Sequence, residues 1–269
     1  MSAVILITGC STGLGRELAL AALSAGLRTL ASLQDQGAKA LKLDVTACAE
    51  DLKAFAAQAV ASFGQIDYLV NNAGFVQGGA IEENTPEENL AQFNTNFFGV
   101  INVTSALLPH FRARKQGTIV NISSQGSALC IPGAGVYCAS KGAVDTITDT
   151  WAHELAKFNI RCTSIQAGAY RTSVAESGNL KIAANKIDGY EGAHEWIETF
   201  NKSAGTERGD VRIAASKIIE LISVDPGRPL PMRLALGEDA YESMKAFHAR
   251  ELENLEKWKS FITGTDVVG

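Results

Sequence analysis

Positive charge is scarce in this 269-residue sequence, which carries 24 lysines and arginines against 29 acidic residues. The formal net charge is -5 and no Lys/Arg cluster occurs, which argues against a nucleic-acid-binding surface. Long apolar runs are also missing, because no segment approaches the roughly 20 residues that a membrane span needs. The amino-terminal residues lead directly into an apolar run without a basic stretch and cleavage site, so we expect no signal peptide.

Cysteine pairing motifs are absent as well. The five cysteines form no C-x-x-C motif and their number is odd, so we expect reduced thiols in a cytoplasmic protein and no metal site. Cys138 adjoins Tyr137, and packing is its expected role. The remaining composition, 46% hydrophobic and 20% charged, is ordinary for a globular protein, and the length suffices for one large α/β domain.

Short β-branched runs alternate with longer helical patterns along the chain. This alternation predicts βαβ units and a parallel, doubly wound, Rossmann-type sheet. Pro86 suits a first helical turn, with Thr85 as its cap. Strands are expected at residues 4–8, 68–71, 118–123, 161–166 and 230–236. Helices are expected at residues 14–25, 47–63, 86–114, 136–158, 210–224 and 238–261.

The region after Arg28 does not fit this alternation. Residues 38–43 resemble a strand, but only four residues would separate them from a strand at 29–33. Parallel strands usually need a crossover of about a dozen residues or more, so residues 29–36 are predicted to end a helix instead. Two helices would then follow one another, and we hypothesise that a strand and a turn are missing between Arg28 and Thr29.

A glycine-rich stretch, Thr8-Gly9-Cys10-Ser11-Thr12-Gly13-Leu14-Gly15, follows the first expected strand and opens the first helix. Glycines let the backbone approach a pyrophosphate closely, and a helix N-terminus adds free N–H groups and a positive dipole end. The spacing is G-x-x-x-G-x-G and differs from the G-x-G-x-x-G dinucleotide fingerprint. The stretch therefore predicts either a phosphate-binding loop or a structural turn.

Tyr137 and Lys141 are four residues apart in one expected helix, and Ser124 lies thirteen residues before the tyrosine. Positions i and i+4 share a helix face, so we expect the Lys141 ammonium beside the Tyr137 phenol. A positive charge there would lower the phenol pKa from its ordinary value of about 10. Ser124 would hold a substrate oxygen against the tyrosine. The alternative is a chance pair on a solvated helix.

In combination these motifs resemble those of the classical short-chain dehydrogenase/reductases, over nearly the whole chain. The matching elements are, in order, the loop at 8–15, Asp44, Asn71-Asn72-Ala73-Gly74, the Ser124/Tyr137/Lys141 set, and Gly168 with Thr172. Residues 229–234, followed by a long helix, are similar to the hydroxysteroid-dehydrogenase-like and acyl-dihydroxyacetone-phosphate-reductase-like branch. Steroid, lipid, polyketide and alkaloid ketones all remain open as substrates.

The resemblance implies a bound nicotinamide dinucleotide. Asp44 would accept from the adenine amino group, Thr172 would bind the nicotinamide carboxamide, and Lys141 would bond the nicotinamide ribose. A strand-end cap at Asp44 and a plain Asn/Gly turn at 72–74 are the alternatives. The implied cofactor-binding residues are Gly9, Ser11, Thr12, Gly13, Leu14, Gly15, Asp44, Val45, Asn72, Ala73, Gly74, Tyr137, Lys141, Gly168 and Thr172.

The implied reaction is reversible hydride transfer between the nicotinamide and a ketone or secondary alcohol. The implied catalytic residues are Asn96, Ser124, Tyr137 and Lys141, with Asn96 supporting a water-linked proton relay to the lysine. A non-catalytic member that senses nicotinamide state or binds a partner stays open, as does an isomerase or dehydratase on the same fold.

Two positions depart from the family pattern. Ala167-Gly168 stands where the family usually has Pro-Gly, which predicts a looser loop. The second strand of the family ends with an acid for NAD or a basic residue for NADP, and neither is readable here. Leu33, the candidate if nothing is missing, is not acidic, so NADP(H) is favoured over NAD(H).

One domain is expected over residues 1–269, with a substrate lid at about 169–209 and a C-terminal helical extension at about 237–262. The lid offers Tyr170, Val174, Trp196 and Phe200, which suit a medium or bulky, partly apolar small-molecule ketone or alcohol, or simply pack the lid down. The two long central helices suit packing between copies in a homodimer or homotetramer, or burial within one subunit.

Overall fold

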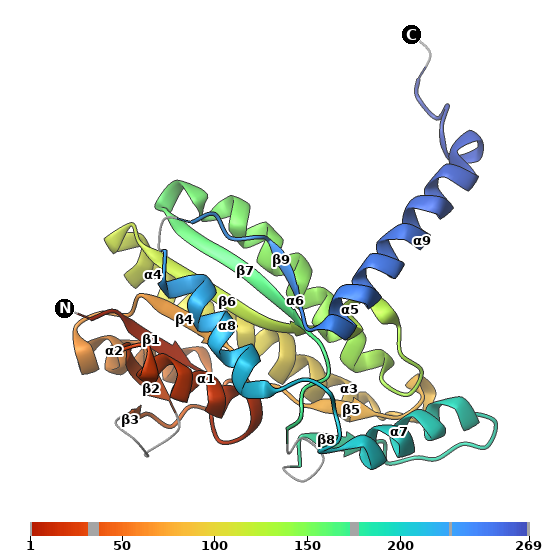
Figure 1. The fold of residues 1–269 in the computed structure, drawn as a ribbon, viewed down its shortest axis with the longest axis horizontal. Coiled ribbons are helices and arrows are strands. Elements are labelled where there is room, and N and C mark those ends of the chain that lie inside the picture. The colour runs from red at the N-terminus through yellow and green to blue at the C-terminus, as the bar shows by residue number, and fades with distance from the viewer. Residues whose placement is uncertain (1, 32–37, 173–177, 226–227, 268–269) are drawn as a thin grey trace.

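A seven-stranded sheet runs through the computed structural model, which describes residues 2–31, 38–172, 178–225 and 228–267 (Figure 1). The strand order is β3-β2-β1-β4-β6-β7-β9, and every pairing within this sheet is parallel. The doubly wound α/β sheet predicted from the sequence is therefore confirmed. Its strands are β1 (Val4–Ile7), β2 (Arg28–Ala31), β3 (Lys39–Ala40), β4 (Tyr68–Asn71), β6 (Gly117–Ser124), β7 (Ile160–Ala167) and β9 (Arg233–Leu236).

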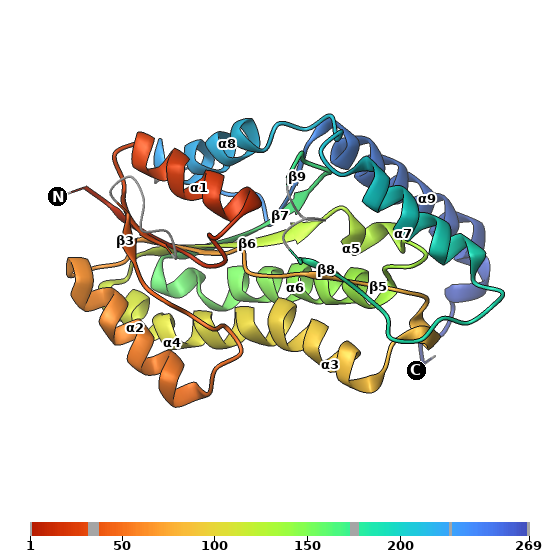
Figure 2. The ribbon, with the colours of Figure 1, turned by 90° about the horizontal axis from the view of Figure 1, so that it is seen from below.

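Helices cover both faces of the sheet (Figure 2). One face carries α1 (Gly13–Ser24) and α8 (Val211–Ser223), and the other carries α2 (Ala49–Phe63), α4 (Gly99–Arg114) and α6 (Gly135–Glu154). Val4 and Leu6 of β1 belong to the core shared with α2 and α4. Ile5 and Ile7 belong to the core shared with α1 and α8. Because both faces are buried, the strands are continuous apolar runs without polar alternation.

The helix predicted at 86–114 is divided into three segments. It begins with α3 (Pro86–Phe93), continues through a π-helical turn, η2 (Asn94–Phe98), and ends with α4. Thr85 caps it as predicted, because its hydroxyl accepts from the Glu88 N–H at 3.2 Å and the Glu88 carboxylate accepts from the Thr85 N–H at 2.8 Å. The π-helical turn is a feature that often marks functional sites.

Two predictions for this region are wrong: residues 29–31 belong to a strand and not to a helix, and no segment is missing after Arg28. Consecutive residues Arg28 and Thr29 pair with consecutive residues of β1, so the chain is continuous there and forms β2. Strand β3 contributes only two residues, and its first residue, Lys39, pairs with Leu30, one residue before the end of β2. The usual crossover length does not apply to so short a strand. Residues 32–37, which include Leu33, lie outside the described residues.

The segment predicted as a lid lies beyond the carboxyl ends of the central strands (Figure 1). Strand β8 (Leu180–Ile182) pairs there with β5 (Val76–Gly78), and α7 (Glu191–Ser203) follows. Buried Glu83, at the end of η1 (Ile81–Glu83), accepts from the Ile187 N–H at 2.7 Å and contacts His194 Nε2 at 2.7 Å. These bonds fasten the segment to the body. Val174 lies outside the described residues.

The last helix, α9 (Glu238–Ile262), begins beside the short α5 (Gly126–Leu129) and projects away from the rest of the molecule (Figure 1). Its bounds agree with the helix predicted at 238–261. Of its residues, only Ala240 and Met244 near its start are buried. Within the described residues, no helix has the length and apolarity required to cross a membrane.

Candidate active site

The glycine-rich stretch links β1 to α1 at the carboxyl edge of the sheet. Gly9 and Gly13 have φ values of 68° and 54°, which residues with side chains rarely adopt. A Cβ at Gly9 would lie 2.7 Å from the Ala73 Cα, and one at Gly15 would lie 2.2 Å from the Gly9 carbonyl oxygen. Thr12 makes no side-chain cap, so it leaves the first-turn N–H groups of α1 to other acceptors. A narrow cradle before an uncapped helix suits a pyrophosphate.

Asn72 fastens this loop to the end of β4. Its side-chain amide donates to the Gly9 carbonyl at 2.9 Å and to the Thr8 carbonyl at 3.1 Å. The Thr8 hydroxyl accepts from the backbone N–H groups of Asn72 and Ala73, both at 3.0 Å. The predicted segment at 72–74 therefore forms one wall of the glycine loop.

Ser124 and Tyr137 are brought together at the same edge, from the end of β6 and the first turn of α6. A Cβ at Gly126 would lie 3.3 Å from Ser124 Oγ and 3.5 Å from Tyr137 Cε1. Ser124 Oγ accepts the Gly126 N–H at 3.0 Å, which leaves its own hydroxyl hydrogen for a further acceptor. Burial raises the pKa of Tyr137 to about 12, and its hydrogen bond with Ser124 acts in the opposite direction.

The structure does not show the predicted lowering of the Tyr137 pKa by Lys141. The Lys141 ammonium lies 5.9 Å from the Tyr137 ring centroid and donates to the Ile122 carbonyl at 2.7 Å. Burial lowers the pKa of Lys141 itself to about 8, and Asp145 partly offsets this. Spacing placed the two side chains near one another, but desolvation by burial is the largest effect on the pKa of each. Tyr137 therefore keeps its proton at neutral pH, while Lys141 titrates close to it.

Asn96 approaches the same point from the π-helical turn. It is fully buried, accepts from the Phe75 N–H at 3.1 Å and donates to the Phe75 carbonyl at 3.0 Å. A Cβ at Gly74 would lie 3.0 Å from Asn96 Oδ1 and 3.7 Å from Lys141 Nζ. Asn96, Gly74 and Lys141 thus converge, and a side chain at Gly74 would crowd Asn96 Oδ1 and contact Lys141 Nζ.

Of the other predicted residues, Thr172 borders the glycine loop, whereas Asp44 and Val45 follow β3 in the chain. The exposed Asp44 accepts from the Thr46 hydroxyl at 2.7 Å and the Thr46 N–H at 2.9 Å, and these bonds lower the pKa of Asp44. Val45 is buried against Gly99, where a Cβ would lie 2.9 Å from Val45 Cγ2. Thr172 lies across the loop, 3.7 Å from the position of a Cβ at Gly13.

Two residues at this edge were not singled out in the sequence, Gln125 and Asp239. The Asp239 carboxylate, in the first turn of α9, accepts from the Ala169 N–H at 2.7 Å and from Gln125 Nε2 at 2.9 Å. No local motif marks either residue, because their meeting depends on where α9 begins relative to β6 and β7.

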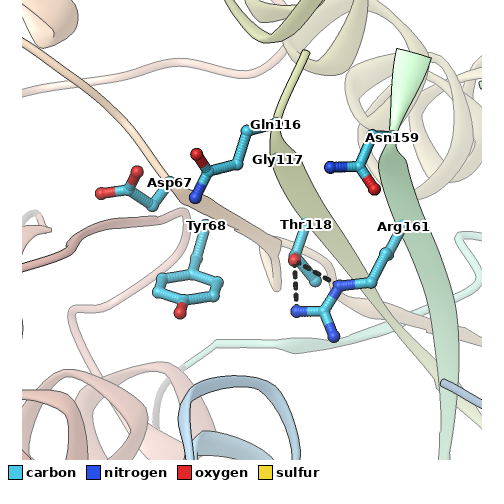
Figure 3. A pocket seen from close by; sticks show the side chains of 7 residues that line it. All are labelled: Asp67, Tyr68, Gln116, Gly117, Thr118, Asn159 and Arg161. Atoms are coloured by element: carbon cyan, nitrogen blue, oxygen red, sulfur yellow. Dashed lines mark hydrogen bonds between the residues drawn. The ribbon is translucent and has the colours of Figure 1, made fainter. Parts of the chain in front are cut away.

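A cavity of about 270 Å³ opens at the opposite, amino edge of the sheet and contains none of the predicted site residues (Figure 3). The Arg161 guanidinium points across it and donates to the Thr118 hydroxyl at 2.8 and 3.2 Å. The cavity is lined by Asp67, Tyr68, Gln116, Gly117, Thr118, Asn159 and Arg161.

Lys141→Met is expected to remove a rise in stability at alkaline pH. Folded Lys141 loses its proton near pH 8, whereas the unfolded side chain keeps it to about pH 10.5. Between these values the unfolded state binds more protons, so the free energy of unfolding of wild type should rise relative to the variant. Denaturant titrations of wild type and variant across this pH range test the prediction. Both proteins contain the same tyrosines and thiols, so the titration of those groups cancels in the comparison. The prediction would be wrong if the free energy of unfolding changed with pH by the same amount in both proteins.

Comparison with known proteins identifies the family. The short chain dehydrogenase family profile matches residues 3–182. A 3-ketodihydrosphingosine reductase of Bacteroides thetaiotaomicron is 35% identical over 192 residues, covering 70% of this chain and 71% of that protein. Oxidoreductase BOA17 of Botryotinia fuckeliana is 31% identical, covering 96% of this chain and 97% of its own. The chain belongs to the short-chain dehydrogenase/reductase family.

Solved structures agree with this assignment. A short-chain dehydrogenase from Streptomyces avermitilis superposes with a TM-score of 0.88 and 33% identity, covering 99% of each chain. A 3-ketoacyl-(acyl-carrier-protein) reductase from Brucella melitensis complexed with NADH gives 0.73 at 25% identity, covering 90% and 98%. ElxO with NADP bound gives 0.71 at 24% identity, covering 87% and 97%, and shows the shared fold.

Proposed function

We propose that this protein is an NAD(P)-dependent oxidoreductase that transfers hydride reversibly between a nicotinamide and a ketone or secondary alcohol. The observation that carries the proposal is the convergence of Ser124, Tyr137 and Lys141 at the sheet edge that also holds the glycine loop. Family membership and the nucleotide-bound structural neighbours support a nicotinamide cofactor. The residues that would hold it are the cofactor-binding set predicted from the sequence.

The chain's own groups suit the proton transfers of such a reaction. A bound nicotinamide coenzyme would supply or accept the hydride. In the reductive direction, the Ser124 hydroxyl would donate to the substrate carbonyl oxygen and hold it beside Tyr137. Tyr137 is protonated at neutral pH because burial raises its pKa, so it has the proton that the forming alkoxide needs. Lys141, with a pKa of about 8, restores that proton through a water-linked relay supported by Asn96.

We further propose a preference for NADP(H) over NAD(H). The position at which the family carries an acid for the NAD ribose corresponds to Leu33 in this sequence. Leucine offers no carboxylate to the 2′-hydroxyl and no negative charge to repel a 2′-phosphate. The preference is measured directly by titrating both nucleotides.

The proposed substrate is a medium or bulky, partly apolar ketone. In the proposed lid, residues 169–209, Trp196 and Phe200 stack with ring centroids 5.2 Å apart on α7. One relative is named as a reductase of 3-ketodihydrosphingosine, a long-chain ketone, which is compatible with an apolar substrate. We place the remaining C-terminal helix, α9, outside the lid as an extension of the same domain.

Fluorescence titration with NADPH and NADH, followed by turnover with a panel of ketones, tests the proposed function. Binding of a reduced nucleotide and its oxidation by an apolar ketone are the expected results. Failure to bind either nucleotide would favour a non-catalytic partner-binding protein. Nucleotide binding without net oxidation by any ketone would favour an isomerase, a dehydratase or a sensor of nicotinamide state.

The proposal extends to the oligomeric state of the protein and to its location in the cell. Leu90 of α3 and Phe98 of η2 are exposed by 57% and 45%, which supports packing between copies in a homodimer or homotetramer. None of the five cysteines forms a disulfide bond, which supports a cytoplasmic location.

A further inference from the structure

We propose that Asp239 is a positioning residue that holds together the two loops flanking the nicotinamide end of the proposed site. This inference rests on the proposed function and adds a role for the first turn of the C-terminal helix. One loop follows β6, whose last residue is Ser124, and begins with Gln125. The other follows β7 and runs from Gly168 toward Thr172.

A single carboxylate oxygen bridges the two loops. Asp239 Oδ2 accepts from the Ala169 N–H at 2.7 Å and from the Gln125 side-chain amide at 2.9 Å. The other oxygen, Oδ1, lies 2.2 Å from where a Cβ of Gly168 would be. Asp239 is exposed, which weakens each bond, but hydrogen bonds to a charged acceptor are about twice as strong as neutral ones and two donors share this oxygen. The bridge therefore constrains both loops.

The Asp239 bridge takes the place of a restraint that a proline before Gly168 would provide. Alanine precedes Gly168 at the position where the family usually carries proline, so no pyrrolidine ring restricts the bend after β7. The Asp239 bond to the Ala169 N–H supplies a restraint at the same bend. On the other side, Gln125 directly follows Ser124, so the same carboxylate also restrains the strand end that carries the proposed catalytic hydroxyl.

The short distance between Gly168 and Asp239 allows their contact to be tested by a double-mutant cycle. Alanine at 168 would place its Cβ against Asp239 Oδ1, so Gly168→Ala should displace the carboxylate in the wild-type background. In an Asp239→Ala background the obstructing oxygen is gone, so the same change should add little. Neighbouring residues in one contact show such non-additivity, whereas independent sites do not.

The variants are Asp239→Ala, Asp239→Asn, and Gly168→Ala alone and combined with Asp239→Ala. The matched control is Glu238→Ala, which removes an exposed acid from the same helical turn. Hydrogen–deuterium exchange of the peptide containing Ala169 reports the restraint without any ligand. NADPH titration and steady-state kinetics report its consequence. For Asp239→Ala we expect faster exchange at Ala169, a Kd and KM for NADPH raised about tenfold, and kcat lowered less than about threefold. Asparagine retains one carbonyl acceptor for both donors and should restore most of the difference.

Unchanged exchange at Ala169 in Asp239→Ala would overturn the inference, whatever the enzyme's activity. Faster exchange with unchanged nucleotide affinity and kinetics would reduce Asp239 to a structural residue and also overturn it. An equal effect of Glu238→Ala would assign the change to the helix terminus and not to the bridge. Loss of all nucleotide binding in wild type would instead refute the proposed function, while the exchange result would still decide whether Asp239 restrains the loop.

Discussion

Tyr137→Phe is expected to remove nearly all turnover while nucleotide binding stays close to that of wild type. Proton transfer by a positioned side chain contributes about 10²- to 10⁴-fold to a reaction rate, and phenylalanine keeps the ring but has no proton to give. The Tyr137 hydroxyl is hydrogen-bonded with Ser124, and the Lys141 ammonium lies 5.9 Å from the Tyr137 ring centroid. We therefore expect kcat to fall about 10³-fold with a substrate panel and the nucleotide Kd to change less than about threefold.

Tyr68→Phe is the matched control for this change. Tyr68 is a buried phenol whose pKa is also raised by burial, but it lies at the amino edge of the sheet beside the cavity in Figure 3. Its substitution should leave kcat within about threefold of wild type. Wild-type turnover in Tyr137→Phe would remove the tyrosine from the proposed mechanism. Equal losses in both variants would point to a general structural defect.

Gly15→Ala is expected to destroy nucleotide binding and to lower the free energy of unfolding. Its Cβ would lie 2.2 Å from the Gly9 carbonyl oxygen and 2.4 Å from Asn72 Nδ2, closer than any real contact. The obstructing oxygen belongs to the backbone of the loop, so relief requires moving the loop itself. Overpacking of this kind costs about 1–3 kcal/mol, which exceeds the roughly 1 kcal/mol that alanine adds to helix propensity.

Gly192→Ala separates this clash from the ordinary effect of adding a methyl group to a helix. Gly192 lies in the first turn of α7, and a Cβ there would meet nothing within 4 Å. Gly192→Ala should leave the free energy of unfolding unchanged or raise it by up to about 1 kcal/mol, as measured by thermal or denaturant unfolding. NADPH titration of Gly15→Ala should show at least about a hundredfold weaker binding, and wild-type affinity would exclude the loop as the pyrophosphate site.

Much of the site follows from local spacing. The i to i+4 relation of Tyr137 and Lys141 requires only a helix, and the helix predicted at 136–158 is present as α6. The glycines at 9 and 13 occupy φ values that exclude most other residues, so a tight loop is encoded in the residue types. Continuous apolar runs were enough to predict buried parallel strands, because both faces of β1 are covered.

Other features could not be predicted from local sequence patterns. The residues from Arg28 to Ala31 form a strand because β1 offers an edge to pair with, which outweighs the helical spacing of Leu30 and Leu33 in the sequence. The single helix predicted at 86–114 contains a π-helical turn that holds Asn96 against Phe75. The pKa of Tyr137 rises although a lysine stands nearby, because charge proximity is visible in sequence while burial is not.

Residue order along the chain was sufficient to predict the parallel α/β fold, the glycine loop and the pairing of tyrosine with lysine. Each leaves a local pattern in the sequence: alternating apolar runs, glycines at a strand end, or an i to i+4 spacing. The protonation behaviour of that pair and the bridge from Asp239 to residues 125 and 169 were decided by the tertiary structure. Both depend on distant segments, which set how much water reaches a group and which donor meets which acceptor.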